Sequence, residues 1–473
     1  MFALIALLPI FGGSDDDVTK IPVDKRIAYT NQLADRFSGP NAWEHYRDAL
    51  ASQVNTFDLS GADWDSPRAK GLWHVSSNMQ ALAECERWTT AESGAIHELL
   101  NANRNTLNFL AKAAQRQRFF RPLPDNAGRL HKAVTDPGEV ASLLGLAKLM
   151  LLAANDHALK GDWDLAYMWN TRVHHMANQL YQQVHTFNQF EAMRVETLAC
   201  RQTLCFLRRN VPESLKGLIE RVATGRDRRC PDELNERAED LWEWDWIEAW
   251  HEWARDPAQH PGLSDMIEMH VGEDDDPLVL KAERVMRDLF DGFQYKSAAD
   301  LREAIRGTTI EEEWRIHCRV IGAYKRWNSR PFHDAWRHVE QFERECCDLM
   351  KMSPALSMFG CGPMMTSDPP LATRSVEILY DGVRISAAVL DYKHRHGRLP
   401  SDLDQLTPGF IDKLPDDPFS GGPYVYRVVD DGADFVLYSV WTDQTDRGGK
   451  RTDEMRVDGD FVIWPPRPSP RDE

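Results

Sequence analysis

The chain has 473 residues, of which 42% are hydrophobic and 10% aromatic, as is typical of a globular protein with a sizeable core. Its 74 acidic and 56 basic side chains give a net charge of −18. This charge argues against nucleic acid as a partner, because phosphate binding needs a basic surface. The length is enough for about two or three domains.

Three interpretations of the first 20 residues stay open. Phe2–Phe11 form an apolar run that is too short to cross a bilayer of about 30 Å as a helix. The apolar run is followed by Gly12-Gly13-Ser14 and then three aspartates, Asp15 to Asp17. This abrupt change in polarity resembles a boundary between membrane and water. The segment is the remnant of a membrane anchor, a degenerate signal segment, or an ordinary buried segment. The first two imply membrane association through the N-terminus.

The region from residue 21 to 358 is predicted to be all-helical. Residues 143–154 and 165–180 each carry an apolar stripe at helical spacing, and Lys160-Gly161-Asp162 forms a turn between them. Residues 192–204 give a third helix. Such antiparallel pairs are typical of tetratricopeptide-like hairpins, but no period of about 34 residues recurs. The sequence therefore predicts an irregular helical array.

A tryptophan-rich helix is predicted over residues 232–255. Trp242, Trp246, Trp250 and Trp253 fall on one helical face with acidic residues between them. A core-facing aromatic stripe is the favoured interpretation. The alternative is an exposed platform for carbohydrate or peptide.

No catalytic residue is predicted. His251-Glu252-Trp253-Ala254-Arg255 begins like a zinc-protease helix but lacks the second histidine that zinc needs. His174 and His185 share a helical face at a separation of roughly 16 Å, too far for one metal ion. His157, His174, His175 and His185 are therefore expected on a solvated helix face. The sequence contains no nucleophile elbow, phosphate loop or dinucleotide-binding glycine turn.

The eight cysteines lack the spacing of a zinc knuckle or a redox motif. Free thiols are the favoured interpretation, and one or two disulfides in an oxidising compartment are the alternative.

A linker is predicted at 359–370, where glycine and proline oppose helix formation. An amphipathic helix follows from Leu371 to His394, with residues 376, 379, 383 and 390 facing a sheet. Residues 424–429 and 434–440 are predicted to form a hairpin, and 461–464 a third strand. Residues 465–473, rich in proline, are predicted to be a disordered tail.

The order of short motifs in residues 371–464 resembles the globular domain of the type II secretion major pseudopilin. The matching pieces are Tyr392-Lys393, Gly397-Arg398-Leu399-Pro400, Leu414-Pro415-Asp416-Asp417-Pro418, Pro423-Tyr424-Val425-Tyr426 and Leu437-Tyr438-Ser439. The resemblance covers about a fifth of the chain and implies a small α+β domain. The helical region resembles, more diffusely, uncharacterised bacterial envelope proteins that end in such a module.

The resemblance also implies a calcium site in the acidic loop before the third strand. Asp443 stands where the family's first ligand follows Leu-Tyr-Ser, and Asp458 and Asp460 match its closing Asp-x-Asp. Calcium takes about six to eight oxygen ligands, which such a loop supplies. One departure is that Trp441-Thr442-Asp443-Gln444 replaces the family's Gly-Ala-Asp-Gly. Another is that the module follows 370 other residues, so pilus assembly is not expected.

The sequence predicts a non-enzymatic protein on the extracytoplasmic face of the cell envelope. Its helical region would contact protein partners, and its C-terminal module would be pseudopilin-like and bind calcium. Two alternatives stay open: a hydrolase with a site in the helical region, and a cytoplasmic helical-repeat adaptor. The identity of the partner does not follow from the sequence.

Overall fold

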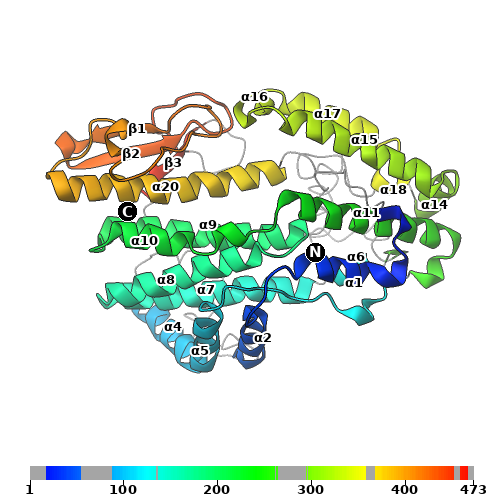
Figure 1. Ribbon diagram of the computed structural model, residues 1–473, viewed down its shortest axis with the longest axis horizontal. Coiled ribbons are helices and arrows are strands. Elements are labelled where there is room, and N and C mark those ends of the chain that lie inside the picture. The colour runs from blue at the N-terminus through cyan, green and yellow to red at the C-terminus, as the bar shows by residue number, and fades with distance from the viewer. Residues whose placement is uncertain are drawn as a thin grey trace.

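The computed structural model describes residues 18–54, 88–134, 137–260, 263–264, 295, 297–357, 368–451 and 459–466. The described chain is mostly helical and carries one small antiparallel sheet near its C-terminus (Figure 1). The helical prediction for residues 21–358 is confirmed where the structure describes them. The first 17 residues, on which the membrane-anchor prediction falls, lie outside the described residues.

The N-terminal helices form the lower part of the molecule in Figure 1. The hairpin predicted around Gly161 is confirmed, because α7 and α8 pack against each other across this turn. The third predicted helix is α9, which packs on both. The elements are α1 (Val23–Ala34), α2 (Ala42–Ser52), α4 (Thr90–Ala102), α5 (Arg104–Ala113), η2 (Asp125–Ala127), α6 (Leu130–Val134), α7 (Pro137–Leu159), α8 (Trp163–Leu180), α9 (Thr186–Arg209), α10 (Leu215–Ala223) and η3 (Arg226–Arg228).

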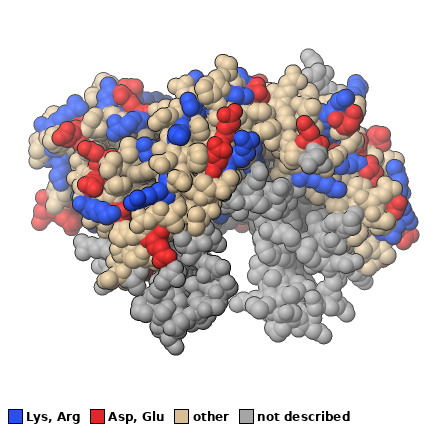
Figure 2. Space-filling model, turned by 90° about the horizontal axis from the view of Figure 1, so that it is seen from below, with Lys and Arg blue, Asp and Glu red and all other residues tan. Residues whose placement is uncertain are grey.

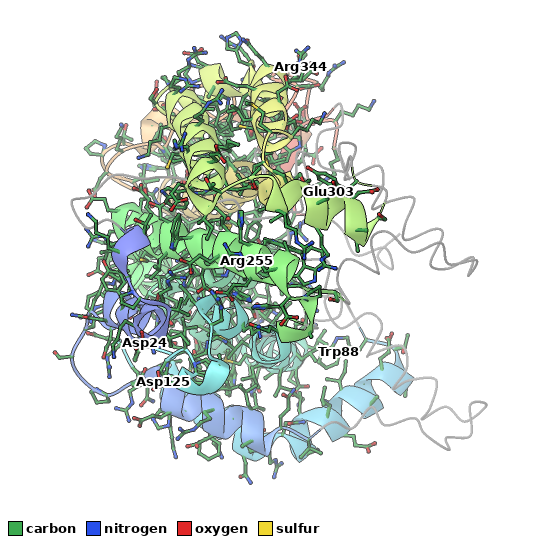
Figure 3. The ribbon with its side chains drawn as sticks, turned by 90° about the vertical axis from the view of Figure 1, so that its right-hand side faces the viewer. Asp24, Trp88, Asp125, Arg255, Glu303 and Arg344 are labelled. Atoms are coloured by element: carbon green, nitrogen blue, oxygen red, sulfur yellow. The ribbon has the colours of Figure 1, made fainter. Side chains whose placement is uncertain are left out.

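The tryptophan-rich helix α11 (Asp232–Arg255) is a central element of the other half of the molecule. It contacts α1 and α6 on one side and α14, α15 and α18 on the other. Figure 3 shows this from the end, with Arg255 of α11 between Asp24 and Asp125 on one side and Arg344 on the other. The remaining helices here are α14 (Ala298–Arg306), α15 (Ile310–Asn328), α16 (Phe332–Trp336), α17 (Val339–Met350) and α18 (Pro354–Ser357).

The tryptophan stripe belongs to the core, as predicted. Trp242, Trp246, Trp250 and Trp253 are all buried. Trp246 stacks on Trp250, and Trp250 meets Trp253 edge to face at a centroid distance of 5.7 Å. Buried rings cannot serve as a platform for carbohydrate, so that alternative is wrong for these residues.

The predicted hairpin and third strand are confirmed. Strands β1 (Val425–Val429) and β2 (Asp434–Ser439) pair antiparallel, with Val425 opposite Tyr438, and β3 (Phe461–Trp464) pairs with the other edge of β2. The turn at residues 430–432 takes a left-handed conformation at Asp431, which aspartate tolerates better than most residues. The predicted disordered tail is wrong at its first two residues, because the structure describes residues 465 and 466 and Pro466 is buried. Residues 467–473 lie outside the described residues.

Helix α20 (Asp368–His396) is buried on two sides, between the sheet and helices α9 and α10 (Figure 1). It begins inside the predicted linker 359–370, most of which lies outside the described residues. Three of the four residues predicted to face the sheet, Leu379, Val383 and Leu390, belong to or pack against the hydrophobic cluster that contains the sheet residues. Val376 is the exception, because it packs in a cluster with α7, α8 and α9. A contact with β3 lies at Gly382, where a Cβ would lie 2.3 Å from Cγ2 of Ile463.

One hydrophobic cluster runs from α11 through α15 and α20 to the sheet. Trp336 of α16 extends this contact, because its indole Nε1 donates to the carbonyl oxygen of Thr442 at 2.9 Å. The C-terminal module is therefore packed onto the helical region and shares its core.

Candidate functional site

A groove of about 870 Å³ follows one face of α8. Its floor comes from α8, one wall from the loop after α5, and the other wall from the end of α10 and from η3. The lining residues are Ala114, Gln115, Arg116, Gln117, Asp164, Tyr167, Met168, Thr171, Arg172, His175, Asn178, Gln179, Gln182, Pro212, Arg221, Thr224, Gly225, Asp227 and Arg228. Floor residues recur every three or four positions, so they share one helical face. Their span within α8, from residue 164 to 179, is ~22 Å at the rise of an α-helix.

Amide side chains of α8 and of the turn after it fix the first wall, the loop after α5. Gln179 donates from Nε2 to the carbonyl oxygens of Ala113 and Arg116, at 2.9 and 2.6 Å. Gln182 donates from Nε2 to the carbonyl oxygen of Gln117 and accepts from the backbone N–H of Phe119. Buried amides that are fully hydrogen-bonded hold a loop in one conformation. This wall is therefore preorganised.

The second wall is fixed from the same helix. Asn178 donates from Nδ2 to the carbonyl oxygen of Thr224 at 3.0 Å. Gly225 turns the chain here with φ of +86°, a left-handed conformation that glycine adopts without a steric penalty. Arg226 and Arg229 form ion pairs with Glu196 of α9, and these pairs attach η3 to α9.

His175 lies between the two walls. Its Nδ1 is 3.3 Å from the carbonyl oxygen of Ala114, and its Nε2 is 2.9 Å from the carbonyl oxygen of Arg221. A neutral imidazole can donate to only one of these two acceptors, and a protonated ring can donate to both. His175 thus spans the groove near its middle.

The groove is basic although the chain is acidic. Arg116, Arg172, Arg221 and Arg228 line it, against Asp164 and Asp227. None of these four arginines forms an ion pair with a carboxylate in the described parts of the chain. Arg172 lies over the ring of Trp169 at 4.2 Å, and burial lowers the pKa of its guanidinium. Figure 2 shows basic and acidic side chains interspersed over the described part of one face, without a broad basic surface.

The histidines of the helical region are less exposed than the sequence suggested. His174 is 1% exposed, and its Nε2 lies 3.0 Å from Oγ1 of Thr203. Burial lowers its pKa to about 3, so it is neutral at ordinary pH. His185 and His251 are buried too. The prediction of a solvated histidine face is wrong for His174 and His185, because neighbouring helices cover both side chains. His157 and His175 are partly exposed.

The acidic C-terminal loop brings two of the three predicted metal ligands to one segment. Asp460 accepts from the backbone N–H groups of Arg447 and Gly449, at 3.2 and 2.7 Å. Asp443 accepts from Nε of the same Arg447 at 3.0 Å. Asp458 lies outside the described residues. Within those residues, no group of three or more possible ligands is placed to hold a metal ion.

Three carboxylates influence one another in this loop. Burial raises the pKa of Asp460, and the neighbouring carboxylates of Asp446 and Asp443 raise it further. Asp446 itself accepts from the phenol of Tyr438 at 2.6 Å and from the N–H of Gly448. The guanidinium of Arg447 is the positive charge that the structure places beside Asp443.

Four of the cysteines, Cys200, Cys205, Cys230 and Cys318, are free thiols in the described part of the chain, as the favoured interpretation predicts. Cys85 and Cys361 lie outside the described residues. No described helix is both long enough and apolar enough to span a membrane.

Sequence reasoning missed the groove, although one signal for it exists. Residues 178 and 179, on a helix that also carries a full apolar stripe, and residues 182 and 183, directly after it, are all amides. A solvated helix face would more often carry lysine and glutamate. Comparison of the chain with protein-family models, with curated proteins and with solved structures finds no match.

Proposed function

We propose that this is a non-enzymatic protein-interaction protein, whose α8 groove receives an extended segment of a partner protein. The observation that carries the proposal is a preorganised groove ~22 Å long with an open, mixed polar and apolar lining. An extended chain advances by about 3.3 Å per residue, so about seven residues would fill it. The groove's polar groups suit backbone and side-chain contacts along a peptide.

The hydrolase alternative receives less support from the same residues. His175 is the only histidine that lines this groove, and both of its ring nitrogens face backbone carbonyl oxygens. A general base would need one of these nitrogens free to take a proton from a nucleophile.

We further propose that the protein acts at the cell envelope, a location supported by the apolar run at residues 2–11.

The groove makes a direct prediction for peptide capture. A phage-displayed library of random eight-residue peptides, selected on the full-length protein, should yield enriched sequences. These should crosslink to a photoreactive residue placed at Met168, a groove residue that is 37% exposed. The matched control is the same residue at Leu159, which is 40% exposed and is not among the groove's lining residues. Equal crosslinking at both positions, or no enrichment, would contradict the proposal.

The pseudopilin-like module is proposed to bind calcium through Asp443, Asp458 and Asp460. Binding to the folded state alone would stabilise it by about 2.7 kcal/mol at a hundredfold excess over Kd. The full-length protein should therefore melt at a higher temperature in calcium than in chelator. Arg447→Ala should enlarge the shift, because the guanidinium competes for Asp443. Asp460→Asn should reduce it, and an unchanged wild-type midpoint would rule out the site.

A further inference from the structure

The four arginines of the groove are distributed unevenly along α8. Arg172 lies near its middle, and the backbone carbonyl oxygens of Arg221 and Arg116 are bound by His175 and Gln179, further along the helix. Arg228 lies beyond them, where its Nη2 donates to Oε1 of Gln117 at 2.9 Å. The C-terminal half of the groove is therefore its basic half.

The other half is more apolar. Tyr167, Met168 and Pro212 line the groove at the N-terminal end of α8, with Asp164 as the acidic residue there. Met168 is an exposed apolar side chain, as are the neighbouring Leu165 and Val211. Leu165 and Val211 do not line the groove themselves, but they adjoin its lining residues Asp164 and Pro212 in the sequence, so Met168 is the exposed apolar contact that this end of the groove offers.

These two halves together specify a ligand. We propose that the groove binds an acidic segment of a partner protein that carries an apolar residue at one end. The apolar residue lies over Tyr167, Met168 and Pro212, and the carboxylates lie along Arg172, Arg221, Arg116 and Arg228. This inference rests on the proposed function and names the chemistry of its partner.

Charge complementarity supports the acidic half of this ligand. The neighbouring Arg226 and Arg229 are already paired with Glu196, whereas the four groove arginines have no carboxylate partner in the described chain. Guanidinium groups bind carboxylates through two parallel hydrogen bonds, which gives direction as well as attraction. Asp227 lies in the basic half and leaves its net charge positive.

The test uses three fluorescent peptides of eight residues and fluorescence anisotropy with the full-length protein. The probe Leu-Phe-Gly-Ser-Glu-Asp-Glu-Glu, or its reversed sequence, should bind. Peptides with lysine or with glutamine at the four acidic positions should bind at least about tenfold more weakly, a difference of about 1.4 kcal/mol. Binding of the acidic probe should also weaken as salt rises, because exposed charges are screened.

Charge reversals then locate the contact. Arg116→Glu and Arg221→Glu should each weaken the acidic probe at least about tenfold. Arg208→Glu is the matched control: it makes the same charge change at an exposed residue of α9 outside the groove, and should have little effect. Circular dichroism and melting curves check that each variant is folded.

The outcomes separate the two proposals. If none of the three peptides binds, and the library gives no enriched sequence, the peptide-binding function itself is wrong. If the glutamine or lysine peptide binds as tightly as the acidic one, or if Arg208→Glu weakens binding as much as Arg116→Glu, only the acidic specificity is wrong. If Met168→Ser leaves the affinity of the acidic probe unchanged, the apolar anchor is wrong.

Discussion

Replacing Arg26 with methionine is expected to lower the free energy of unfolding by about 3–5 kcal/mol. Arg26 is 2% exposed, and its Nη1 lies 2.8 Å from Oδ1 of Asp245 and 2.8 Å from Oε2 of Glu248. Asp245 is fully buried. Without Arg26, the buried carboxylate of Asp245 would keep a more distant arginine, Arg129, whose nearest nitrogen is 3.5 Å away. Chemical denaturation of the purified protein measures the loss.

Lys25→Met is the matched control, because it removes the neighbouring cation from an exposed pair. The Lys25 Nζ lies 3.4 Å from Asp24, and both side chains are at least 70% exposed. Exposed pairs contribute about 0–1 kcal/mol, so the control should change little. Equal losses for the two variants would mean that the Arg26 contacts are not those of a buried network.

The pH dependence of stability provides a second readout of the same network. Burial opposes ionisation of Asp245, but its hydrogen bonds with His131 and Arg26 outweigh burial and lower its pKa to about 2. The folded pKa lies below the unfolded value of about 3.8, so the contribution of Asp245 is present above that value. It is lost as pH falls from about 4 towards about 2. Arg26→Met should reduce this acid-dependent loss, because it removes one cause of the shift.

Local sequence patterns predicted the local elements well. The β1–β2 hairpin follows from alternating β-formers around Asp430-Asp431-Gly432, and the α7–α8 hairpin follows from two stripes around Gly161. Both depend on residues that are neighbours in the sequence. Helix α20 shows the limit of this approach. Its existence and most of its sheet-facing residues were predicted. The packing of Val376 against α7, α8 and α9 and the close approach of Gly382 to Ile463 depend on residues that are far apart along the chain.

The groove and the ionic network were beyond such patterns for a physical reason. The groove walls are held by α8 amides that bind backbone carbonyls 44 to 66 residues away, and an amide in a sequence does not reveal its partner. Arg26 and Asp245 are 219 residues apart, and each looks like an ordinary charged residue of an amphipathic helix. Only the packing of α1, α6 and α11 brings them together. The acidic loop was found because a family resemblance marked Asp443 and Asp460, not because of their pairing.

Replacing Trp250 with alanine should cost about 3–5 kcal/mol of unfolding free energy, as expected when a large buried aromatic side chain is truncated. Trp250 is 0% exposed and packs between Trp246 and Trp253. Its truncation would therefore leave a cavity inside the core. The loss is expected in denaturant titrations followed by circular dichroism.

Trp250→Phe is the matched variant and should cost much less. It retains an aromatic ring between the two neighbours and removes an indole N–H that has no hydrogen-bond partner among the described residues. An alanine variant that loses less than about 1 kcal/mol would mean that this ring is not in a packed core.

Because the cluster containing Trp250 continues through α20 to Ile463, the alanine variant should also lower the midpoint at which the β1–β3 sheet unfolds. Unchanged protection of the β2 amides from hydrogen exchange in that variant would show instead that the two regions unfold independently.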